Sequence, residues 1–154
     1  MYAFSILLFL IHYSTEKNKS PERRIELLLL YQLIFSLGMT SLLAFIGLTF
    51  LPEYIAAYMN WPACPFEQEL GNVNLSFGIL GILCIWYRGH FWTATILGFS
   101  IWILADGVHH LYDIFINRNF SPGNLGVSLY TDFIVPIVLL ILLPLYLNSQ
   151  KKKG

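Results

Sequence analysis

Residues 91–116, FWTATILGFSIWILADGVHHLYDIFI, form a long apolar segment whose second half carries four ionisable side chains. The segment is long enough to cross a bilayer as a helix, because about 20 apolar residues span the hydrocarbon core. Ionisable groups inside such a helix are costly, and those that occur usually face a bundle interior and mark function. The four are Asp106, His109, His110 and Asp113.

Helix geometry places these four side chains on one face. At about 100° per residue they fall within a sector of roughly 100°. The opposite face is apolar and holds Leu104, Val108, Leu111 and Phe115. We therefore predict that one side of this helix contacts lipid and that the other contacts neighbouring helices.

The composition is typical of a polytopic membrane protein. Of the 154 residues, 56% are hydrophobic and only 12% are charged, whereas soluble domains usually carry about a quarter charged residues. Nine basic and nine acidic residues give a formal net charge of zero, and the absence of a basic patch argues against nucleic acid as a partner. Cys64 and Cys84 are expected near opposite ends of one span, too far apart for a disulfide, and a packing role is expected for both.

The apolar pattern predicts an all-α integral membrane bundle that forms a single transmembrane domain over residues 1–154. A short apolar helix at 1–13 reaches only about 20 Å, less than the hydrocarbon core of ~30 Å, so its crossing of the membrane stays open. Pro21 after Ser20 suits the start of the next helix. Four full transmembrane helices follow, at about residues 25–51, 65–87, 91–116 and 125–147.

Small residues predict where these helices approach one another, because they let helix backbones pack closely in a membrane. On the second full span they are Gly71, Asn74, Gly78 and Gly81. On the first full span they are Ser36, Thr40 and Ala44.

The basic residues predict the orientation. If the charged connector Thr15–Glu26 is cytoplasmic, the turn Arg88–His90 and the tail Lys151–Lys153 are cytoplasmic too, and only Arg118 among the nine basic residues lies outside. This arrangement satisfies the positive-inside rule and places the C-terminus in the cytoplasm. The outer loops are then expected at 52–64 and 117–124.

With this orientation, polar side chains from three spans meet at a similar depth near the outer face. Such a cluster can bind or pass a proton, a cation or a small polar solute, or it can simply hold helices in register. Pro136 adds to the cluster, because it has no N–H to donate to the carbonyl of Asp132 one turn earlier. The candidate ligand or ion cluster consists of Glu69, Asn72, Asp106, His109, His110 and Asp132.

Part of this cluster has the chemistry of a metal site. Imidazole and carboxylate groups bind Zn, Mn or Fe, and the candidate metal ligands are Glu69, Asp106, His110 and Asp132. Asp106-x-x-His109 is half of the carboxylate-x-x-His pattern of di-iron bundles, which need two such pairs. The sequence contains no recognised catalytic motif, so no residue is assigned a catalytic role. The cofactor stays open, with a divalent transition metal as the candidate.

One stretch resembles a known family. Trp61-Pro62-x-Cys64-Pro65-Phe66-x-x-Glu69-x-Gly71-x-x-Asn74-Leu75 is similar to the W-P-x-S-P-F-x-x-E-x-G-x-x-N-L signature of small, uncharacterised bacterial multi-pass membrane proteins. The resemblance extends through Asp106-x-x-x-His110 to Leu129-Tyr130-x-Asp132. It implies a location in the bacterial cytoplasmic membrane and indicates that His110, rather than His109, is the family-type histidine. It implies no activity.

Three functions remain open from the sequence, so the protein is not assigned as an enzyme. The first is a membrane protein that binds or passes a proton, cation or small polar solute. The second is a membrane-embedded, metal-dependent oxidoreductase. The third is a non-catalytic subunit of a membrane complex. The lipid bilayer is the expected partner in all three, and a homo-oligomer is compatible with each.

Overall fold

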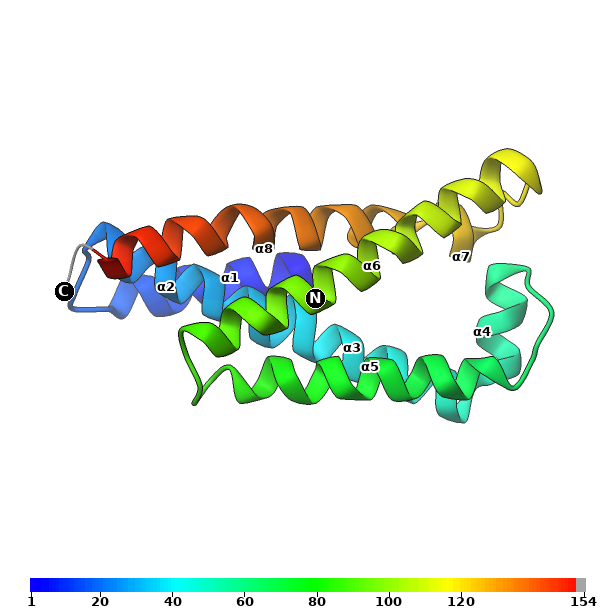
Figure 1. The fold of residues 1–154 in the computed structure, drawn as a ribbon, viewed down its shortest axis with the longest axis horizontal. Helices are drawn as coiled ribbons and strands as arrows, with labels where there is room; N and C mark the ends of the chain where they lie inside the picture. The colour runs from blue at the N-terminus through cyan, green and yellow to red at the C-terminus, as the bar shows by residue number, and fades with distance from the viewer. Residues whose placement is uncertain (152–154) are drawn as a thin grey trace.

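The computed structural model describes residues 1–151, and every regular element among them is helical. The long helices run along one axis and form an elongated bundle (Figure 1). This confirms the predicted all-α fold with its short apolar N-terminal helix; the predicted place of Lys152 and Lys153 lies outside the described residues. In chain order the elements are α1 Tyr2–Thr15, α2 Pro21–Tyr31, the π-helix η1 Gln32–Met39, α3 Thr40–Phe50, α4 Pro52–Met59, α5 Phe66–Leu83, α6 His90–Ile116, α7 Pro122–Leu125 and α8 Val127–Lys151.

Three helical segments are long and apolar enough to cross a membrane: Pro21–Phe50, His90–Ile116 and Pro122–Lys151. They correspond to three of the four predicted spans. The remaining predicted span, residues 65–87, corresponds to α5. This helix has 18 residues, and its first turn contains the polar run Glu67, Gln68 and Glu69. Because this polar run makes α5 less apolar than the other three, its membrane crossing stays a prediction.

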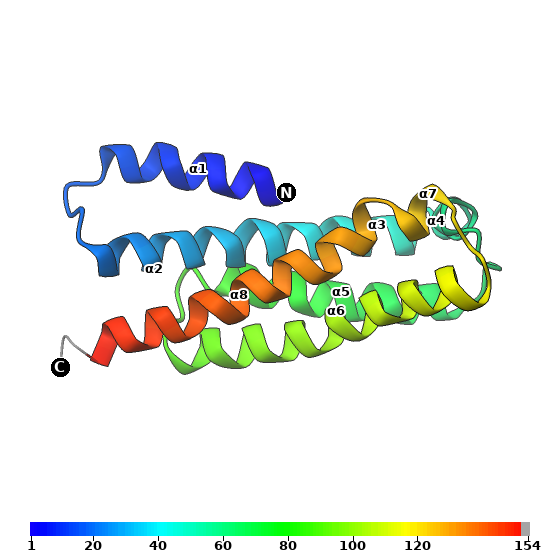
Figure 2. The same ribbon diagram turned by 90° about the horizontal axis from the view of Figure 1, so that it is seen from above.

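The first long segment changes its helical winding in the middle. The π-helix η1 joins α2 to α3, and π-turns inside α-helices are rare and often lie near functional sites. Here the winding places Gln32 and Ser36 in a buried network with Ser5 of α1. Gln32 Nε2 donates to Ser5 Oγ at 2.8 Å, and Ser36 Oγ donates to Gln32 Oε1 at 2.7 Å. The network fixes α1 against η1, and the N-terminal end of α1 lies about halfway along the bundle (Figure 2).

Glycines bring α5 against α3 and η1. The predicted stripe Gly71, Asn74, Gly78 and Gly81 is buried along its whole length. A Cβ at Gly81 would lie 2.5 Å from the Cα of Gly38 on η1, and one at Gly78 would lie 2.6 Å from a methyl carbon of Leu42. The stripe is therefore a helix-packing surface, as predicted.

The predicted loop at 52–64 contains a helix, α4. Pro52 lies in its first turn with Glu53, which is favourable at a helix N-terminus. Asn60 ends the helix in the left-handed conformation, with φ of 56°. The helix was not predicted because it has only 8 residues and lies in a connector between two spans.

The basic residues lie mainly at one end of the bundle. The connector before α2, the α5–α6 turn and the end of α8 lie toward one end, whereas α4 and α7 lie at the other (Figure 1). Ser20 caps α2 as predicted, since its Oγ accepts from the N–H of Arg23 at 3.2 Å. Arg23 donates to Glu16 at 3.0 Å, and this hydrogen bond holds the pKa of Glu16 below its usual value. Arg88 extends the cluster by an ion pair to Glu26 at 3.9 Å.

Candidate metal centre

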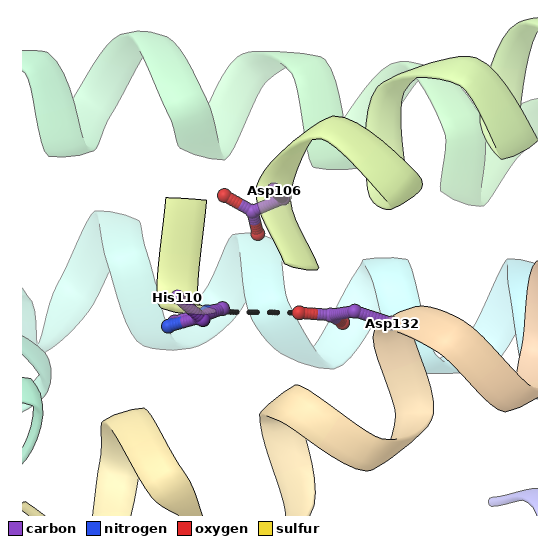
Figure 3. A group of neighbouring side chains, drawn as sticks. All are labelled: Asp106, His110 and Asp132. Carbon is purple, nitrogen blue, oxygen red and sulfur yellow. Dashed lines mark ion pairs between the residues drawn. The ribbon is translucent and has the colours of Figure 1, made fainter. Parts of the chain in front are cut away.

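Three acidic and imidazole side chains meet between α6 and α8. Asp106 and His110 lie one turn apart on α6, so they project from the same face, and Asp132 reaches them from α8 (Figure 3). One possible ligand atom from each lies within 4.8 Å of those of the other two. His110 and Asp132 are buried, at 2% and 7% exposure, and Asp106 is half-buried.

A glycine allows this meeting. A Cβ at Gly107 would lie 3.2 Å from the Cβ of Asp132 and 3.0 Å from the ring of Phe133. A larger residue at this position would push α8 away from α6. The small residue after Asp106 therefore brings the α8 carboxylate within reach of His110.

The hydrogen bonds of His110 define its tautomer. The side-chain amide of Asn124 donates through Nδ2 to the backbone carbonyl of Asn119 at 2.8 Å, and a carbonyl can only accept. The Oδ1 of Asn124 therefore faces His110 Nδ1, at 2.6 Å, and accepts a hydrogen from it. In a neutral imidazole with hydrogen on Nδ1, the Nε2 atom carries a lone pair. In its neutral form, His110 therefore turns an electron-pair donor toward the carboxylate of Asp132.

The carboxylate opposite this nitrogen lacks a hydrogen bond. Asp132 Oδ2 lies 3.6 Å from His110 Nε2, which is too long for a hydrogen bond. Among the described residues, this oxygen and Ser100 Oγ are the buried side-chain polar atoms without a hydrogen-bond partner. A buried polar atom without a partner is unfavourable. A cation bound to both Asp132 Oδ2 and His110 Nε2 would supply the missing partner.

A polar cap covers the group at the α4 end of the bundle. Trp61 stacks on the ring of His110, with centroids 5.4 Å apart and planes at 13°. Its indole N–H donates to Asp113 Oδ2 at 2.8 Å, and Asn117 and Asn119 donate to the same carboxylate at 2.7 and 2.6 Å. Asp113 therefore holds together the linker after α4 and the loop after α6, which both lie over His110.

A cavity of about 320 Å³ adjoins the three side chains. It lies between the segment η1–α3 on one side and the helices α6 and α8 on the other, and α4 and Trp61 close one end. Its wall includes Asp106, His110 and Asp132. The predicted stripe of Ser36, Thr40 and Ala44 also lines this cavity.

The structure separates the other predicted site residues from this group. Glu69 and Asn72 are exposed on α5, because the buried stripe of that helix is the one that contains Gly71 and Asn74. Glu67, two residues earlier, lines the cavity instead. His109 is exposed, and its ring contacts the edge of Trp61 with centroids 5.5 Å apart. Of the six predicted cluster residues, the structure brings together Asp106, His110 and Asp132.

Two contacts of the site were not predicted from the sequence. Trp61 covers His110, and Asn124 orients it. Both come from segments between the spans, where periodicity gives no information about spatial neighbours. The only available signal was the resemblance to the family signature, which begins at Trp61.

Comparison with known proteins places the chain in a family without assigning an activity. The profile of DUF6790, a family of unknown function, matches residues 1–152, so the chain belongs to that family. No curated protein and no solved structure matches the chain.

Proposed function

We propose that this member of DUF6790 is a membrane protein that binds one divalent transition-metal cation through Asp106, His110 and Asp132. The observation that carries the proposal is the position of His110 Nε2, which lies 3.6 Å from a buried carboxylate oxygen of Asp132 that has no hydrogen-bond partner. Two ligand atoms about 2.1 Å from a tetrahedral ion are roughly 3.4 Å apart. The separation therefore suits two ligands of one ion better than a direct hydrogen bond.

The surroundings of His110 support the same conclusion. Histidine ligands of metals almost always donate their other ring N–H to a carbonyl or carboxylate, which fixes the ring and its tautomer. Asn124 supplies that acceptor here, at 2.6 Å. One imidazole and two carboxylates form a ligand set that suits Zn, Mn or Fe. The remaining coordination positions would be open toward the cavity.

Metal analysis of the purified protein tests the proposal. The protein would be prepared in lipid nanodiscs with a tag that lacks histidine, and Zn, Mn and Fe would be measured per chain. We expect about one ion per chain, lost in His110→Ala and in the double variant Asp106→Asn/Asp132→Asn. His109→Ala is the matched control, because this neighbouring histidine is exposed and outside the group; it should keep the metal.

Two results would contradict the proposal. One is a wild-type protein that neither contains a stoichiometric ion nor takes up added Zn²⁺ or Mn²⁺ in a saturable way. The other is a metal content that His110→Ala leaves unchanged. Circular dichroism measures the helix content of each variant, and size-exclusion chromatography measures its elution volume. Wild-type values for both show that a variant has lost the metal and not the fold.

The cavity favours a second function for the same centre, a metal-dependent oxidoreductase that acts on a lipid-soluble substrate. An ion held by three protein ligands with open positions beside a cavity is the usual arrangement of catalytic rather than structural metal sites. The test is the oxidation of an added quinol to its quinone by the Mn- or Fe-loaded protein, with dissolved dioxygen as the added acceptor of the two electrons and two protons. Turnover that His110→Ala abolishes would support this function.

A further inference from the structure

We propose that the cavity beside Asp106, His110 and Asp132 binds a neutral, lipid-soluble molecule whose head is an aromatic ring with a hydroxyl group, of the phenol or quinol type. The inference rests on the proposed function in one respect, because it treats the three side chains as a metal site. It adds the class of molecule that occupies the space next to that site.

The cavity has the size and the wall of a site for a small apolar molecule. Its volume of about 320 Å³ lies within the range of ligand pockets, which are mostly apolar with a few polar groups that fix orientation. The apolar part of the wall comes from three sides of the bundle: α3, α4, and the pair α6 and α8. It includes Leu43, Ala44, Leu48, Ile55, Phe99 and Val135.

Aromatic side chains favour a flat ring in this space. Trp61, Phe99 and Trp102 all line the cavity. Trp102 stacks on Phe77 at a centroid distance of 5.2 Å, and Phe99 packs edge-on against Trp102 at 6.0 Å. These contacts hold the indole and phenyl groups in place, and stacked or edge-on contact with a bound ring adds to the burial of its area.

The charges of the wall select a neutral head that can donate a hydrogen bond. Asp106, Asp132 and Glu67 all line the cavity, and an anionic head such as a fatty-acid carboxylate would bring a further acidic group beside them and would have to leave water for a mostly apolar space. A neutral hydroxyl group, by contrast, can donate to a carboxylate oxygen that the ion leaves free. Its own oxygen could bind the ion at a coordination position that the protein leaves open.

The cavity reaches the surface where the bundle faces lipid. Leu43 of α3 lines the cavity and is 49% exposed, and it belongs to the long apolar segment Pro21–Phe50. A lipid-soluble molecule could therefore enter at the side of the bundle, beside Leu43. A route of this kind suits a ligand that is dissolved in the bilayer.

Fluorescence quenching tests the proposal. The probe is a ring-brominated alkylphenol, because bromine quenches tryptophan on contact and both Trp61 and Trp102 line the cavity. The protein in lipid nanodiscs should show saturable quenching. Decyl hydroquinone should displace the probe, dodecanol should displace it more weakly, and dodecanoate should not displace it.

A matched pair of variants locates the binding. Ala44→Phe places a ring inside the cavity and should lower the affinity for the probe by about tenfold or more. Ala105→Phe makes the same change on an exposed position of α6 that does not line the cavity, and should leave the affinity unchanged.

The outcomes separate this inference from the metal proposal. Quenching that rises linearly and equally in wild type and both variants would show partition into lipid only and would overturn the inference, whatever the metal content. Displacement by dodecanoate as effective as that by decyl hydroquinone would overturn the assignment of a neutral aromatic head. Linear quenching and displacement by dodecanoate can both be measured on the wild-type protein alone, so they decide the matter even if Ala44→Phe does not fold. Saturable binding by a wild type that neither contains nor takes up a metal ion would support this inference and contradict the metal proposal.

Discussion

His109 and His110 are adjacent in the chain, yet the structure gives them different environments. His110 is buried, has its Nδ1 held by Asn124 and lies beneath the indole of Trp61. His109 is turned by about 100° around the helix axis and is exposed. Of the sector that holds the four ionisable side chains, only the edge with His109 is exposed, because His110 and Asp113 are buried and Asp106 is half-buried.

Asn124→Ala is expected to weaken the metal site without removing a ligand. Loss of the acceptor on Nδ1 leaves the His110 ring free to rotate and to change tautomer, and such changes typically cost 10–100-fold in metal affinity. Titration of the apo protein with Zn²⁺ in nanodiscs measures the effect. Asn72→Ala, an exposed asparagine on α5, is the control and should bind as the wild type does. Equal affinities for the two variants would show that Asn124 does not position His110.

The three residues of the site could be predicted from the sequence, but the residues that orient and cover them could not. Asp106, His110 and Asp132 stand out because ionisable groups are rare in apolar helices. Glu69 and Asn72 were selected as well, because they are polar and were expected at the same depth, but the buried face of α5 is the neighbouring stripe with Gly71 and Asn74. The contacts of Trp61 and Asn124 depend on the paths of the segments before α5 and after α6, which no periodicity describes.

At the scale of elements, glycines determine how the helices pair. Gly38 and Gly81 bring η1 and α5 together, and Gly107 does the same for α6 and α8. The α5 stripe was predictable, because small residues at helical spacing indicate close packing in membranes. The π-helix was not, because its sequence, Gln32–Met39, differs little from that of the α-helices on either side.

Gly81→Ala is expected to destabilise the bundle. Its Cβ would lie 2.5 Å from the backbone of Gly38, so α5 must move away, and overpacking of this kind costs about 1–3 kcal/mol. Thermal unfolding in nanodiscs, followed by circular dichroism, measures the change. Gly98→Ala is the matched control, because its Cβ would meet only the ring of Phe77, at 3.7 Å. If both variants unfold at the wild-type temperature, the close crossing of η1 and α5 is not important for stability.

At the scale of the whole molecule, the site lies toward the α4 and α7 end, away from the end that carries the basic connectors (Figure 1). We propose that the basic end faces the cytoplasm of a bacterial cell, in line with the positive-inside rule. The metal centre then lies in the outer half of the membrane, beneath the cap formed by Trp61 and Asp113.

Cysteine labelling measures this orientation. Cys64 is exposed and follows α4, whereas Cys84 is buried. A membrane-impermeant maleimide added to intact cells should therefore label the wild-type protein, and Cys64→Ser should abolish the labelling. In a Cys64→Ser background, Ser14→Cys at the exposed end of α1 should react only after the cells are permeabilised. The reverse pattern would show that the basic end faces outward.

The central claim is that Asp106, His110 and Asp132 share one metal ion. X-ray absorption at the edge of the bound metal tests it most directly, because the technique distinguishes imidazole from carboxylate ligands around the ion itself. We expect one imidazole with oxygen ligands at about 2.0–2.2 Å, and the imidazole signal should be absent from any metal that remains in His110→Ala and intact in His109→Ala. A spectrum without imidazole, or one that His110→Ala leaves unchanged, would contradict the account.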